Sequence, residues 1–149
     1  MAKQTIIHHN IEPVHYVSDA FISWCFDARF SELLNKFIEL RKFKNVDIVK
    51  MAGGGKVFAT PEIETEEIHY LGQIAKSVKL HHTKSIILMA HANCGAYGKH
   101  FEDKAMEEAF YVNELRAAKE TVASFLKKNE IKIPIETYYA DFSGLHLIN

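Results

Sequence analysis

The feature that most constrains the fold of this chain is an alternation between short apolar runs and longer stretches with helical spacing. Runs typical of buried strands occupy residues 20–26, 46–51, 85–90 and 135–142. Between them lie stretches with apolar residues three or four positions apart: residues 31–41, a stretch that starts at Thr60-Pro61, and residues 101–128. This order predicts a mostly parallel α/β sheet with right-handed connections.

The length of the chain fits one such domain. Its 149 residues are enough to bury one hydrophobic core. We expect residues 20–149 to form a single domain, with strand order 2-1-3-4 and helices on both faces of the sheet. Residues 145–148 return as a short edge strand, and residues 1–19 form an N-terminal arm.

Charge and hydropathy narrow the classes of partner. The formal net charge is −1, which predicts no binding to nucleic acid or to an anionic membrane surface. The longest apolar run, residues 86–90, is too short to span a bilayer, and the start of the chain lacks the pattern of a signal peptide. We therefore expect a cytoplasmic protein, in which the two cysteines are more often reduced ligands than a disulfide, although the sequence leaves a disulfide open.

Three potential metal ligands follow two strands that this fold makes neighbours. Cys25 ends the first strand, and His91 and Cys94 follow the third. In strand order 2-1-3 these strands are adjacent, and ligands bind beyond the carboxyl ends of such strands. Two thiolates and one imidazole suit zinc and leave a fourth position open for catalysis. The alternative is two buried cysteines beside an unrelated histidine.

A carboxylate and a guanidinium accompany the first cysteine. Asp27 and Arg29 lie two and four positions after Cys25, and alternate residues of an extended chain share a face. A carboxylate paired with a guanidinium stays ionised and fixed in direction. It could accept a proton or hydrogen bond near the metal, or occupy the fourth position itself. The alternative is a structural salt bridge.

The run Gly53-Gly54-Gly55-Lys56 fits neither a phosphate-binding loop nor a dinucleotide-binding loop.

These residues resemble the signature of the β-class carbonic anhydrases. That family pairs Cys-x-Asp-x-Arg with a later His-x-x-Cys-Gly, as in Cys25-Phe26-Asp27-Ala28-Arg29 and His91-Ala92-Asn93-Cys94-Gly95, and Met51-Ala52-Gly53-Gly54 is similar to its glycine loop. The resemblance implies one Zn²⁺ per chain on Cys25, His91 and Cys94, and a catalytic dyad of Asp27 and Arg29. It implies substrate contacts at Gly53, Gly54 and Gly95, reversible hydration of CO2 to bicarbonate by a zinc-bound hydroxide, and a homodimer or higher homo-oligomer.

Departures from the family pattern keep other readings open. Lys50-Met51 replaces the usual Arg-Asn pair, Asn93 replaces a common aspartate, and the N-terminal region is short. The same site could hydrolyse COS or CS2, or the protein could bind zinc in an oligomer without catalysis. Whether Asp27 ligates the zinc or leaves that position free is also open.

Overall fold

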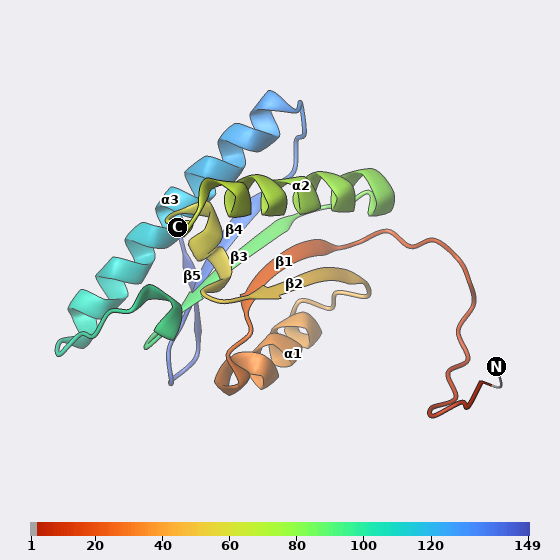
Figure 1. The fold of residues 1–149 in the computed structure, drawn as a ribbon, viewed down its shortest axis with the longest axis horizontal. Helices are drawn as coiled ribbons and strands as arrows, with labels where there is room; N and C mark the ends of the chain where they lie inside the picture. The colour runs from red at the N-terminus through yellow and green to blue at the C-terminus, as the bar shows by residue number, and fades with distance from the viewer. Residues whose placement is uncertain (1–2) are drawn as a thin grey trace.

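The structure is a computed structural model that describes residues 3–149. A five-stranded sheet forms the centre of the molecule (Figure 1). Its strands are β1 (Ala20–Cys25), β2 (Val46–Met51), β3 (Ile86–His91), β4 (Ile135–Ala140) and β5 (Leu145–Ile148). Their order is β2-β1-β3-β4-β5; the first four are parallel and β5 is antiparallel to β4. The predicted order 2-1-3-4 is confirmed, and residues 145–148 form the edge strand.

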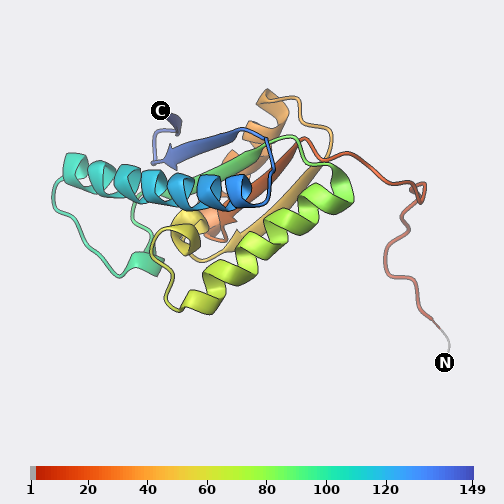
Figure 2. The same cartoon turned by 90° about the horizontal axis from the view of Figure 1, so that it is seen from above.

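Helices cover both faces of the sheet, as predicted. α1 (Ser31–Leu40) lies on one face, and α2 (Glu64–His81) and α3 (Lys104–Lys128) lie on the other (Figures 1 and 2). Short 3-10 turns follow the carboxyl ends of the first three strands: η1 (Ala28–Phe30), η2 (Gly54–Phe58) and η3 (Gly95–Tyr97). Within residues 3–149 no helix combines the length and apolar character needed to cross a membrane.

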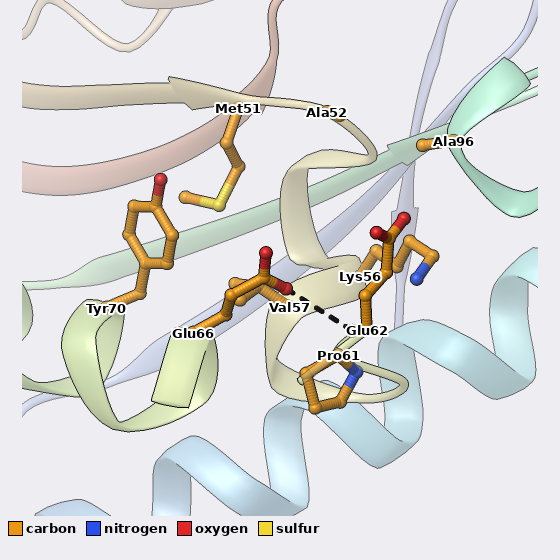
Figure 3. A pocket seen from close by; sticks show the side chains of 9 residues that line it. All are labelled: Met51, Ala52, Lys56, Val57, Pro61, Glu62, Glu66, Tyr70 and Ala96. Atoms are coloured by element: carbon orange, nitrogen blue, oxygen red, sulfur yellow. Dashed lines mark hydrogen bonds between the residues drawn. The ribbon is translucent and has the colours of Figure 1, made fainter. Parts of the chain in front are cut away.

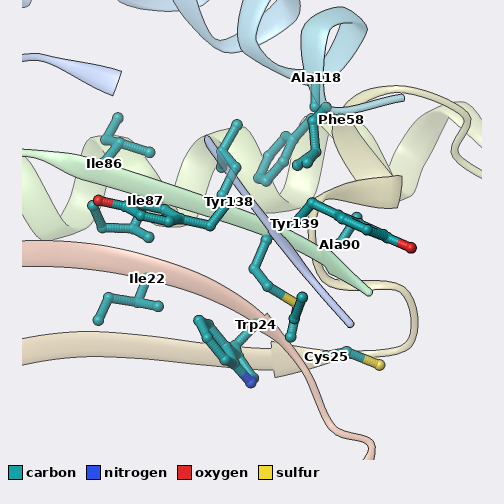
Figure 4. Packing of buried hydrophobic residues seen from close by; sticks show 14 of the residues in the cluster. Ile22, Trp24, Cys25, Phe58, Ile86, Ile87, Ala90, Ala118, Tyr138 and Tyr139 are labelled. Atoms are coloured by element: carbon teal, nitrogen blue, oxygen red, sulfur yellow. The ribbon is translucent and has the colours of Figure 1, made fainter. Parts of the chain in front are cut away.

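The two strands that carry the candidate ligands lie in the middle of the core. Every residue of β1 and β3 is buried, because these strands have neighbours on both sides and helices over both faces. Trp24 and Cys25 lie in this core at the end of β1 (Figure 4). Trp24 packs against Phe37 of α1, and its indole N–H donates to the Phe30 carbonyl at 3.2 Å. The core therefore fixes the ends of both strands, where Cys25 and His91 lie.

The second helix begins later than the sequence predicts. It starts at Glu64, so the expected start at Thr60-Pro61 is wrong. The Thr60 hydroxyl donates to Glu114 Oε2 on α3 at 2.6 Å and ties this segment to its neighbour instead of capping α2. Three glutamates in the first turn of α2 suit the positive end of its dipole where a side-chain cap is missing: Glu64, Glu66 and Glu67.

Residues 3–17 have no regular secondary structure and extend away from the domain (Figures 1 and 2). At the base of this arm, the Tyr16 hydroxyl donates to Asp47 Oδ1 at 2.7 Å. Further out, four aliphatic side chains are at least 72% exposed: Ile6, Ile7, Ile11 and Val14. The first two residues of the predicted arm lie outside the described residues.

Candidate metal centre

The ends of β1 and β3 bring three potential metal ligands together. Cys25 is the last residue of β1, His91 is the last residue of β3, and Cys94 follows three residues later. Their ligand atoms all lie within 4.8 Å of one another, and all three residues are buried. In residues 3–149 no other group of three or more histidine, cysteine or acidic side chains has this arrangement. The pairing of β1 with β3 explains how residues so distant in sequence meet.

The imidazole of His91 is oriented for a metal ion. Its Nδ1 lies 2.8 Å from the Ala92 carbonyl oxygen, so Nδ1 carries the proton and donates. Its Nε2 is buried and has no hydrogen-bond partner in the described part of the chain. Buried polar atoms nearly always have partners, so this nitrogen lacks something that a cation would supply. A protein hydrogen bond to the other ring nitrogen is also the usual way to orient a histidine ligand.

The two cysteines are free and electrostatically coupled. The neighbouring Cys94 thiol lowers the pKa of Cys25 to about 4. The proximity of Cys25, together with burial, raises the pKa of Cys94. The protein alone therefore favours one thiolate, and a second thiolate needs the charge of a bound cation. With the unpartnered nitrogen of His91, this donor set fits zinc.

Asp27 and Arg29 form an ion pair at the edge of this cluster. Arg29 Nη2 donates to Asp27 Oδ2 at 2.6 Å, and Nε lies 3.0 and 3.1 Å from the two carboxylate oxygens. The guanidinium lowers the pKa of Asp27 to about 2. Asp27 Oδ2 lies 3.8 Å from His91 Nε2. An ionised carboxylate is thus held beside the nitrogen that would bind a metal.

Sequence reasoning missed the partners that hold this ion pair and the ligand loop. Arg29 Nη1 donates to Asn93 Oδ1 at 3.0 Å, and Nη2 donates to the Asn93 carbonyl at 3.1 Å. The Cys94 amide donates to the hydroxyl of Tyr111, a fully buried residue of α3, at 3.1 Å. Asn93 stood out only as a departure from a family pattern, and nothing near Tyr111 in the sequence marks its role.

The predicted substrate-binding glycines differ in what the fold demands of them. Gly54 has φ +58°, and a Cβ there would lie 2.4 Å from the Met89 carbonyl oxygen and 3.0 Å from the Cys25 nitrogen. Gly53 has φ +80° and is close to Lys56. A Cβ on Gly95 would meet nothing within 4 Å. Packing around Cys25 therefore requires Gly54, and a left-handed backbone with Lys56 close by requires Gly53. Packing within the chain does not require Gly95.

Two hollows flank the candidate ligands without being lined by them. One, of about 190 Å³, lies between the end of β2 and the start of α2 (Figure 3), and its lining includes Met51, Lys56, Glu66 and Tyr70. The other, of about 640 Å³, is lined by Asn93 and by residues of α3 and of the segment after β4. Met51 therefore faces the first hollow, and Asn93 faces the second.

Comparisons with known proteins agree with this geometry. A family model described as "Putative carbonic anhydrase" matches residues 18–143. No curated protein gives a significant match. Among solved structures, carbonic anhydrase from Streptococcus mutans matches with a TM-score of 0.60 at 15% identity, covering 95% of this chain and 88% of that chain. β-Carbonic anhydrase isoform I from Trichomonas vaginalis gives 0.59 at 15% identity, with 95% and 87% covered.

A third structure, carbonic anhydrase from Glaciozyma antarctica, gives a TM-score of 0.51 at 19% identity and covers 92% of this chain and 85% of that chain. At these identities the similar structures establish the fold, and the family model, which spans most of the chain, establishes the membership. The chain belongs to the carbonic anhydrase family and has the fold of its β class.

Proposed function

We propose that this protein catalyses the reversible hydration of CO2 to bicarbonate with one zinc ion per chain, held by Cys25, His91 and Cys94. The observation that carries the proposal is the buried, unpartnered Nε2 of His91 within 4.8 Å of two cysteine sulfurs. The family membership of the chain supports the same reaction. Rapid-mixing measurement of CO2 hydration by zinc-loaded protein tests it.

Zinc, when bound, lowers the pKa of a coordinated water towards about 7 and so supplies a nucleophile near neutral pH. The chain itself holds the carboxylate of Asp27 beside His91 Nε2, the atom that would bind the metal. Asp27 remains ionised because Arg29 lowers its pKa to about 2. Its carboxylate can accept a hydrogen bond or a proton near His91 Nε2, and the Arg29 guanidinium fixes its direction.

We expect Asp27→Asn to keep zinc and lose turnover. The amide has nearly the shape of the carboxylate, but it carries no charge and is a poor proton acceptor. The expected fall in kcat/KM is about 10²- to 10⁴-fold, the usual contribution of a positioned acid–base group. Zinc content by mass spectrometry and stopped-flow CO2 hydration measure the two effects.

A matched control for this change is Asp47→Asn, which removes another hydrogen-bonded, largely buried carboxylate, on β2 and outside the candidate centre. Folded Asp47→Asn protein should hydrate CO2 at the wild-type rate. A zinc-loaded Asp27→Asn protein with wild-type kcat/KM would remove Asp27 from the mechanism.

Assays of the same zinc-loaded protein with COS and CS2 distinguish CO2 from the alternative substrates. COS and CS2 are linear molecules that the same site could hydrolyse. Release of sulfide from COS without measurable CO2 hydration would move the assignment to these substrates. A full zinc complement without turnover of CO2, COS or CS2 would identify a non-catalytic zinc protein.

We also propose that the protein forms a homodimer or a higher homo-oligomer and works in a reducing compartment such as the cytoplasm. The exposed aliphatic side chains of the arm support association, because water disfavours such a surface on an isolated chain. The two free cysteines support the compartment, because they can bind a metal only when reduced.

Replacing the four exposed aliphatic residues of the arm by serine should weaken association. The variant changes Ile6, Ile7, Ile11 and Val14. Losing the burial of two such side chains at about 1.5 kcal/mol each corresponds to more than a hundredfold in the dissociation constant. Light scattering with size-exclusion chromatography measures it, and serine at His8 and His9 is the control. An unchanged oligomer in the aliphatic variant would show that the arm is not part of the interface.

A further inference from the structure

We propose that Asn93 is a positioning residue that acts through Arg29 to keep the Asp27 carboxylate from becoming the fourth metal ligand. This inference rests on the proposed metal centre. It identifies a residue that keeps the fourth ligand position open to a molecule from solvent. It follows from four contacts: the distance from Asp27 to His91, the bonds from Arg29 to Asp27, the bonds from Arg29 to Asn93, and the bond from Asn93 to Glu107.

Asp27 is close enough to ligate a metal. Its Oδ2 lies 3.8 Å from His91 Nε2. Two ligand atoms at about 2.0–2.1 Å from a tetrahedral zinc are separated by about 3.4 Å. A small movement of the side chain would therefore place Oδ2 at a ligand position. The structure must contain something that opposes this movement if the fourth position is to remain available.

Arg29 supplies that opposition by occupying the acceptor sites of the carboxylate. Oδ1 accepts from the Arg29 backbone N–H and from Nε, each at 3.0 Å. Oδ2 accepts from Nε at 3.1 Å and from Nη2 at 2.6 Å. A carboxylate has about four lone-pair sites, so Asp27 can bind a metal only by giving up bonds to Arg29. The orientation of Arg29 therefore determines whether Asp27 is free to move.

Asn93 holds the far side of the guanidinium. Its side-chain oxygen accepts from Nη1 at 3.0 Å and its carbonyl oxygen accepts from Nη2 at 3.1 Å. The rings of Phe30 and Phe142 lie 5.9 and 5.4 Å from the guanidinium carbon but provide no directional hydrogen bond. Because 45% of the Arg29 side chain is exposed, the contacts with Asn93 add to the bonds with Asp27 in holding the plane of a group that solvent could otherwise reorient.

The position of Asn93 is itself imposed by the fold. It lies between His91 and Cys94, and its backbone N–H donates to Glu107 Oε1 of α3 at 2.7 Å. Its φ of +55° is in the left-handed region, which asparagine tolerates better than most residues. The backbone carbonyl and the side-chain oxygen can both reach Arg29 in this conformation. Asn93→Gly therefore removes only the side-chain contact and relieves the backbone, whereas alanine would add strain.

The test uses full-length protein in which Co²⁺ replaces zinc, because the visible spectrum of Co²⁺ reports its ligands directly. Thiocyanate is titrated into wild-type protein, Asn93→Gly, Asp27→Ala and the double variant. We expect thiocyanate to shift the wild-type spectrum and to bind Asn93→Gly at least about tenfold more weakly, because Asp27 then competes for the position. The double variant should bind thiocyanate as tightly as Asp27→Ala. His82→Gly, at another left-handed position outside the candidate centre, is the control for the glycine itself.

Each outcome of the thiocyanate titrations either supports or overturns the proposed role of Asn93. Weaker thiocyanate binding in Asn93→Gly that is restored by Asp27→Ala supports it, since general damage to the site would not be rescued by a second loss. Identical titrations of wild type and Asn93→Gly overturn it, as does weakening that Asp27→Ala does not restore. A wild-type protein that binds Co²⁺ but shows no response to thiocyanate also overturns it and leaves the metal centre intact. A wild-type protein that binds neither Co²⁺ nor zinc refutes the proposed function as well.

Discussion

Cys25→Ser is expected to abolish zinc binding and to reduce CO2 hydration to the uncatalysed background. Cys25 supplies one of the two thiolates of the candidate centre, and its sulfur lies within 4.8 Å of the ligand atoms of His91 and Cys94. A serine hydroxyl stays protonated and neutral near pH 7. Loss of an outer partner of a ligand typically costs ten- to a hundredfold in metal affinity, so loss of a ligand itself should exceed about a hundredfold. Metal analysis after dialysis against a weak chelator measures the change.

Cys25→Ser should leave the fold intact, so a loss of zinc can be attributed to the missing thiolate. Serine has nearly the volume of cysteine, and Cys25 lies at the carboxyl end of β1, where the strand has already paired with both neighbours. Circular dichroism of metal-free wild type and metal-free variant should therefore coincide. A folded Cys25→Ser protein that retains one zinc per chain at wild-type affinity would mean that the metal lies elsewhere.

Gly54→Ala is expected to produce a large loss of stability. The added Cβ would lie 2.4 Å from the Met89 carbonyl oxygen, which belongs to the central strand β3 and cannot move without breaking the sheet. Overpacking of this kind costs about 1–3 kcal/mol, and a left-handed alanine costs about 1–2 kcal/mol more. A total of about 3 kcal/mol would lower Tm by about 6–12 °C for a chain of this length.

Gly98→Ala separates the two contributions to this loss. Gly98 has φ +59°, nearly the same as Gly54, but a Cβ there would meet nothing within 4 Å. Its substitution should cost only the backbone term of about 1–2 kcal/mol. Thermal and urea unfolding of both variants compare them directly. Equal losses in the two variants would show that the contact with Met89 carries no cost.

The parallel sheet was predictable because its signal is carried by whole segments. β1 and β3 are apolar at nearly every position, since both faces of each strand are buried, and the stretches between strands have helical spacing. Rules of connection and chirality favour such a sheet but allow several strand orders. In the order 2-1-3 the first and third strands are neighbours, and Cys25 lies next to His91. The juxtaposition of the candidate ligands is in this sense a property of the topology.

The parts that sequence reasoning missed depend on single side chains. Thr60 resembled a helix cap, but it donates to Glu114, a residue 54 positions away, so α2 begins later. Asn93 holds Arg29 across 64 positions, and Tyr111 supports the Cys94 amide from a helix whose register no motif fixes. These contacts join segments that are far apart in the sequence, and local pattern carries no signal for them.

The most direct measurement of the central claim is stopped-flow CO2 hydration between about pH 6.5 and 9 by protein that carries one zinc per chain, with Cys25→Ser as control. We expect a catalysed rate that rises with pH as the nucleophile forms and that is absent in the control. A rate indistinguishable from background at every pH, in protein shown to hold zinc on Cys25, His91 and Cys94, would contradict the assignment of CO2 hydration to this site.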